Sequence, residues 1–289
     1  EEFSPRYNHY LAVGIEKDIK ESEIGDKPQK CIDEVNRQGG VGLISHPDHK
    51  GPKRFKGKDY PWTDWSVSGY QGISIWDFQT DWQEKLVSVP RALLSYVFPS
   101  WSLSGPKTET LKRWDELNQT KRILGFGEID CHNFKKTFYG FKTEIFPFDY
   151  SFSTIRTHVL LNSELSKDCA SAKKQIVEAL RQSRAYVAQE TWNRAHGFSF
   201  SVYDQNIKAV SGDTFKLGKD TTKIEVAIPK KGMIKLIRNG NVLGEYKNKQ
   251  YFCSEIKDPG VYRVEVLKKV FGKNKPWIYS NPIRVTKDE

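Results

Sequence analysis

The sequence predicts an α/β domain followed by a small all-β sandwich, because its pattern of apolar residues changes near residue 205. Before that point, short continuous apolar runs alternate with helical patterns, which is typical of a parallel sheet covered by helices. After it, apolar and polar residues alternate with the period of two that half-buried strands show. We therefore place a first domain at residues 1–203 and a basic β-sandwich module at residues 206–289.

The first domain contains six candidate strands and three candidate helices. In each helix, apolar residues recur three or four positions apart, which gives one buried face. Gly39 and Gly40 end the first helix, since a glycine commonly follows a helix C-terminus. We expect strands at Tyr10–Ile15, Val41–Ser45, Gly72–Trp76, Arg122–Ile129, His158–Leu161 and Ala185–Ala188, and helices at Pro28–Gln38, Lys107–Gln119 and Ser166–Gln182.

Two turn signals organise the second module. Asn239-Gly240 favours the positive φ angles of a type I′ hairpin turn, and Asp258-Pro259-Gly260 is a second turn. An immunoglobulin-like sandwich of about 80 residues fits this spacing. Its strands are expected at Lys223–Ile228, Ile234–Arg238, Asn241–Tyr246 and Val261–Lys268.

The net charge of +10 is unevenly distributed. Residues 206–289 contain 18 Lys and Arg against 9 Asp and Glu, whereas the preceding 205 residues are nearly neutral at +1. The nearly neutral charge of the first domain therefore gives no sign of a basic groove for nucleic acid. No apolar run reaches the length of about 18 residues that a membrane-spanning helix needs. The 4 cysteines show no CxxC spacing, so neither a disulfide framework nor a zinc–thiolate site is expected.

Polar residues with metal-binding side chains follow two of the expected strands. His46 comes directly after the apolar run that ends at Ser45. Asp130 and His132 are two residues apart at the end of another strand, so on an extended backbone they leave the same face. Glu128 lies two residues before Asp130 and therefore leaves the same face, although its role is open. A carboxylate with an imidazole suits Zn²⁺, Mn²⁺ or Fe²⁺ better than Ca²⁺.

Several of these stretches, in this order, resemble the polymerase and histidinol phosphatase (PHP) metallohydrolases. The matching stretches are Glu2…His9, His46-Pro47, Gly72-Ile73-Ser74-Ile75-Trp76 and Asp130-Cys131-His132. The run from Ala179 to Ala188 resembles a subgroup that includes carbamate-hydrolase-like members. The resemblance covers residues 1 to about 203, with the β module as an appendage.

The resemblance implies a distorted, TIM-like β/α barrel that holds two or three Mn, Fe or Zn ions at the carboxyl ends of its strands. The implied metal ligands are Glu2, His9, His46, Asp130 and His132, of which Asp130 and His132 would also be catalytic. The family opens with an H-x-H strand that this sequence lacks. The resemblance therefore implies that the N-terminal part of the domain is missing and that the site is incomplete.

The implied function is metal-dependent hydrolysis, with a phosphoester of a small anionic molecule as the expected substrate. Arg156 and His49 are candidate substrate contacts, although a salt-bridged Arg156 is an equal alternative. Hydrolysis of a carbamate, ester or amide by the same site stays open. So does a non-catalytic scaffold whose basic module docks on an anionic polymer or surface. No nucleic-acid partner is expected, and the sequence leaves the compartment undecided.

Overall fold

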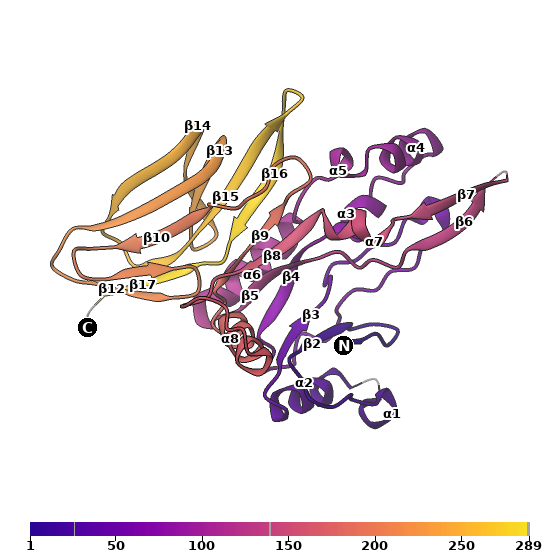
Figure 1. Ribbon diagram of the computed structural model, residues 1–289, viewed down its shortest axis with the longest axis horizontal. Helices are drawn as coiled ribbons and strands as arrows, with labels where there is room; N and C mark the ends of the chain where they lie inside the picture. The colour runs from indigo at the N-terminus through magenta and orange to yellow at the C-terminus, as the bar shows by residue number, and fades with distance from the viewer. Residues whose placement is uncertain (26, 139, 288–289) are drawn as a thin grey trace.

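The computed structural model describes residues 1–25, 27–138 and 140–287. A five-stranded sheet forms the N-terminal half (Figure 1). Its strands follow the order of the chain: β1 (Glu2–Phe3), β2 (Tyr10–Val13), β3 (Val41–Ile44), β4 (Gly72–Asp77) and β5 (Leu124–Glu128). Strands β3, β4 and β5 are parallel, whereas β2 is antiparallel to both β1 and β3. The carboxyl ends of three strands therefore meet the amino end of β2 at one edge.

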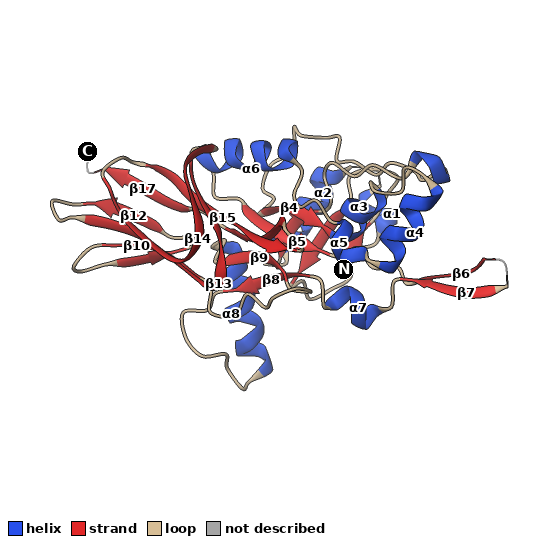
Figure 2. Ribbon diagram, turned by 90° about the horizontal axis from the view of Figure 1, so that it is seen from above, coloured by secondary structure: helices blue, strands red, loops and turns tan. Residues whose placement is uncertain are grey.

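The three predicted helices are present with shifted ends, as α2 (Pro28–Arg37), α6 (Thr108–Thr120) and α8 (Cys169–Arg181). The other elements of this half were not predicted. A β hairpin projects from the body of the molecule (Figure 2), and the others are short helices of 4 to 9 residues. These elements are α1 (Glu21–Ile24), α3 (Phe78–Gln83), α4 (Val89–Val97), α5 (Pro99–Ser102), α7 (Phe148–Phe152), and the hairpin strands β6 (Phe134–Phe138) and β7 (Phe141–Ile145).

The predicted TIM-like barrel is wrong. The fold has 38% strand and 23% helix, and the described residues form no closed barrel. After β5 the chain builds β8 (Ile155–Val159) and β9 (Ala185–Gln189), which are antiparallel to each other and belong to a second, ten-stranded sheet. A barrel needs a parallel strand after each helical crossover, and only β3, β4 and β5 follow that pattern.

The ten-stranded sheet contains the predicted sandwich strands together with β8 and β9. Strand β9 pairs with β16, and β10 pairs with β13, so strands from both sides of the predicted domain boundary share one sheet. Asn239 (φ 50°) and Gly240 (φ 78°) form the predicted hairpin turn. The remaining strands are β10 (Ser199–Tyr203), β11 (Lys208–Val210), β12 (Thr214–Leu217), β13 (Thr222–Arg238), β14 (Asn241–Ile256), β15 (Gly260–Val270), β16 (Lys273–Ser280) and β17 (Ile283–Lys287).

The side chain of Asn281 joins the two sheets where β5 passes β9. Asn281 is fully buried. Its amide nitrogen donates to the carbonyls of Gly125 (2.8 Å) and Ala185 (3.0 Å), and its amide oxygen accepts from the Gly125 N–H (2.7 Å). Asn281 thus supplies the hydrogen bonds that a neighbouring strand would otherwise give to the edge of β5.

Replacing Asn281 by alanine is expected to lower the free energy of unfolding by about 3 kcal/mol, because each buried backbone group left without a partner costs about 1–3 kcal/mol. Urea denaturation measures the change. The matched control, Asn274→Ala, alters an exposed strand residue and should stay within about 0.5 kcal/mol. Equal stability of the two variants would show that Asn281 does not hold the sheets together.

Candidate metal centre

The backbone register places Glu2, His9 and His46 at the same edge of the five-stranded sheet. Glu2 is opposite Leu11, and His9 lies two residues before Leu11, so Glu2 and His9 share a face. The His9 carbonyl accepts a hydrogen bond from Ser45 N (3.1 Å), which brings His9 beside the end of β3. His46 therefore meets two residues that are distant from it in the sequence.

The three side chains form a compact group. The Glu2 Oε1 atom lies 3.2 Å from His9 Nδ1 and 3.8 Å from His46 Nε2. One ligand atom from each residue fits within a mutual distance of 4.8 Å. The other imidazole nitrogens, His9 Nε2 and His46 Nδ1, are buried and have no hydrogen-bond partner among the described residues. Two imidazoles and one carboxylate thus converge on one point.

Further carboxylates surround His46. The carboxylate of Glu128 accepts a hydrogen bond from the His46 backbone N–H (2.5 Å). Burial raises the pKa of Asp77, Glu128 and Asp130, and repulsion from a neighbouring carboxylate adds to the effect in each case, which for Asp130 is that of Glu2. Burial opposes a charge on His46, yet Glu2 and the other carboxylates raise its pKa to about 10. The pKa of Glu2 falls to about 2, mainly through His46 and then His9.

These residues fit a divalent transition metal ion. Nitrogen and oxygen ligands suit Zn²⁺, Mn²⁺ or Fe²⁺, and His9 Nδ1 and His46 Nε2 both lie beside the Glu2 carboxylate. Buried carboxylates that repel one another are stabilised by a nearby cation. Two candidate residues, His46 (φ 24°) and Asp130 (φ 44°), also have left-handed backbone angles that non-glycine residues adopt infrequently. Such conformations often occur at functional sites.

The two candidate ligands at the end of β5, Asp130 and His132, occupy different positions relative to the group of Glu2, His9 and His46. The carboxylate of Asp130 is close enough to interact electrostatically with His46, Glu2 and His9, but Asp130 is outside their compact group. The His132 ring is half exposed, stacks on Phe134 (5.1 Å between centroids) and has its Nδ1 3.0 Å from the Asp130 carbonyl oxygen. The structure therefore brings Asp130 to the site and places His132 at its margin.

The two predicted substrate contacts also differ. His49 packs edge-on against His46, with ring centroids 5.3 Å apart. Burial and the charges of His46 and Lys107 lower the pKa of His49 to about 4, so the ring is neutral at neutral pH. Arg156, in contrast, forms an ion pair with Glu190 (2.9 Å) and does not line the cavity beside His46. Of the two roles considered for Arg156, a substrate contact or a salt-bridged arginine, the structure shows the salt bridge.

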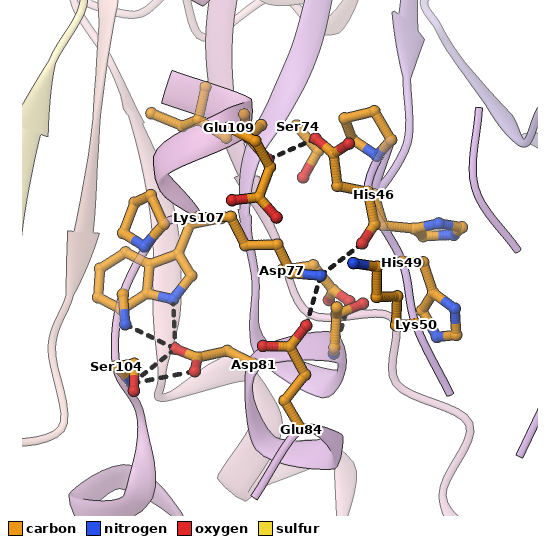
Figure 3. A pocket seen from close by; sticks show the side chains of 18 of the residues that line it. His46, His49, Lys50, Ser74, Asp77, Asp81, Glu84, Ser104, Lys107 and Glu109 are labelled. Carbon is orange, nitrogen blue, oxygen red and sulfur yellow. Dashed lines mark hydrogen bonds and ion pairs between the residues drawn. The ribbon is translucent and has the colours of Figure 1, made fainter. Parts of the chain in front are cut away.

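A cavity of about 490 Å³ opens beside His46. Figure 3 shows His46 and His49 on one side of it, with Lys107 reaching across toward Asp77 and Glu84. The Lys107 ammonium contacts the Glu84 carboxylate and the Asp48 carbonyl. The Asp48 carboxylate accepts hydrogen bonds from Thr110 and from Arg113 (2.6 and 2.9 Å). These contacts fix the wall that lies next to the metal-ligand group.

Sequence reasoning missed two residues of this site. Asp77 ends β4 and accepts hydrogen bonds from the N–H groups of Gln79 and Thr80, so it caps α3 while facing Glu128 and Asp130. Its position at a strand end is the signal that could have revealed it. Lys107 was assigned only to the start of a helix, and nothing in its sequence context indicates that it reaches Asp48.

Among the described residues, no helix has the length and apolar character of a membrane span.

Comparison of the chain with protein-family models, with curated proteins and with solved structures finds no match. The geometry of the centre is therefore the basis for assigning a function.

Proposed function

We propose that this protein is a metal-dependent hydrolase with Glu2, His9 and His46 as metal ligands. The observation that carries the proposal is the convergence of these three side chains on one point beside a cavity. A divalent ion held there would lower the pKa of a bound water and neutralise charge on a phosphoryl or carbonyl oxygen. Asp130 is the candidate for a further ligand, because its carboxylate faces the group.

The chain's own residues would orient a substrate in the cavity. Lys50 and Lys107 line it and can donate to the oxygens of a phosphoester. The neutral ring of His49 lies between His46 and Tyr60, whose N–H donates to His49 Nδ1 (3.2 Å). His49 is therefore held in one orientation and can position a polar group of the substrate. These contacts support a phosphoester as the first substrate class.

A second candidate is the hydrolysis of a carbamate, ester or amide. The lining of the cavity favours it, because carboxylates outnumber lysines there and would repel a substrate with several negative charges. An uncharged carbonyl compound avoids that repulsion. The lining carboxylates are Asp48, Asp77, Asp81, Glu84 and Glu109, against Lys50 and Lys107.

Hydrolysis of p-nitrophenyl phosphate and p-nitrophenyl acetate, each with added Mn²⁺ or Zn²⁺, separates the two classes. We expect metal-dependent turnover of the phosphate ester that is lost in His46→Ala and retained in the control His196→Ala, whose exposed ring is not part of the ligand group. Turnover of the acetate ester alone would favour the second candidate. Metal-independent turnover of either ester, unchanged in His46→Ala, would contradict the proposed hydrolase centre.

A further inference from the structure

A second cavity, of about 350 Å³, lies between α4, α5 and the start of β16. Four cationic side chains line it: Lys85, Arg91, Lys273 and Lys275. Among the described residues, Glu84 is the one carboxylate that lines it, and Glu84 is already in contact with Lys107. The cavity shares Glu84 and Ser104 with the cavity beside His46 but does not include the metal-ligand group.

The positive charges of this cavity are poorly compensated. Lys85 has an ion pair with Asp81 (3.6 Å). In the part of the chain that the structure describes, Arg91, Lys273 and Lys275 form no ion pair with a carboxylate. Burial lowers the pKa of Lys275, and the charges of Lys273 and Lys85 add to this effect although Asp81 opposes it. Like charges gathered in one cavity repel one another, and a bound anion would remove that cost.

The contacts of Lys275 hold one side of the cavity in place. Its ammonium donates to the carbonyl oxygens of Trp101 and Leu103 (3.1 Å for the latter), which joins β16 to the end of α5. The ammonium groups of Lys273 and Lys275 each lie 5.3 Å from the centroid of the Trp101 ring. The two lysines are therefore anchored by a tryptophan that itself lines the cavity.

We propose that this cavity binds a small phosphate-bearing anion through Arg91, Lys273 and Lys275. Three cations without carboxylate partners match a group that carries about two negative charges and three acceptor oxygens. A ligand with a single carboxylate group would neutralise less of the excess positive charge in the cavity. The arginine can bind a phosphate with two parallel hydrogen bonds, and the lysines add point charges. This site does not depend on the proposed hydrolase activity.

Isothermal titration of the full chain with inorganic phosphate tests the proposal. A chelator in the buffer keeps divalent ions away from the Glu2–His9–His46 group. We expect saturable binding that weakens by about tenfold in Arg91→Gln and again in Lys273→Gln, because each variant removes a charge-assisted hydrogen bond. Both side chains are exposed, so the variants should fold, and thermal melting verifies this. Sodium acetate, titrated in the same way, should bind more weakly than phosphate.

The matched control is Lys249→Gln, which removes an exposed lysine of the same basic module outside the cavity. Phosphate binding to this variant should equal that of the unaltered chain. Absence of saturable phosphate binding would overturn the proposal. Equal weakening in all three variants would also overturn it, since it would mean diffuse attraction of phosphate to the overall positive charge of the chain. Tighter binding of acetate than of phosphate would refute the phosphate assignment.

Discussion

His46→Ala is expected to lower the affinity of the protein for Mn²⁺ and Zn²⁺ by more than about a hundredfold, since losing groups that merely orient a metal ligand already costs about 10- to 100-fold. His46 is the most buried member of the ligand group. Its backbone N–H is fixed by Glu128 and its ring packs against both His9 and His49. An alanine at this position supplies no ligand atom in place of the imidazole.

Metal content by plasma mass spectrometry and metal titration would measure this loss, with His196→Ala as the control for removal of a histidine elsewhere. An ion at about 100 times its Kd should stabilise the unaltered chain by about 2.7 kcal/mol, and this stabilisation should disappear in His46→Ala. Asp130→Asn should weaken binding less than His46→Ala, because Asp130 lies outside the compact group. Undiminished metal affinity in His46→Ala would exclude the proposed centre.

The positions of the candidate ligands were predictable to different degrees. Continuous apolar runs located β3, β4 and β5 within two residues at each end, so the sequence alone placed His46 and Asp130 at strand ends. That the N-terminal Glu2 and His9 join them depends on β2 pairing antiparallel with both β1 and β3. Neither periodicity nor spacing encodes that pairing, and only the resemblance to a family suggested it.

The barrel prediction failed because strand direction is not visible in an apolar run. The strands β8 and β9 have the composition of parallel strands, but β9 bonds to β16 from the other end of the chain. The Asn281 side chain then binds the edge of β5 that a further parallel strand would have used. The Asn281 amide and the Thr157 hydroxyl, both distant from β5 in the sequence, thus bond the backbone of β5, and no local pattern indicates these contacts.

A second long-range contact joins α6 to β15. Arg263 is 3% exposed and Asp115 is 7% exposed. Two parallel hydrogen bonds connect them, from Nε to Oδ1 (2.6 Å) and from the terminal nitrogen to Oδ2 (2.8 Å). Glu265 accepts another hydrogen bond from the Arg263 guanidinium (2.7 Å). The central carbon of that guanidinium lies 5.4 Å from the centroid of the Trp114 ring. The helix and the large sheet are thereby fixed to each other.

Asp115→Ala is expected to lower the free energy of unfolding by about 3–5 kcal/mol, because it leaves the buried Arg263 without its main partner. Urea denaturation would measure this against Glu116→Ala, which alters the exposed neighbour on α6 and should change stability by less than about 0.5 kcal/mol. The double variant Asp115→Leu with Arg263→Met separates two causes of the loss of stability, the unpaired charge of Arg263 and the missing bidentate contact. Since the double variant removes both charges, it should be more stable than Asp115→Ala if the unpaired guanidinium causes the loss. A double variant as unstable as Asp115→Ala would instead show that the pair is needed for its specific bidentate geometry.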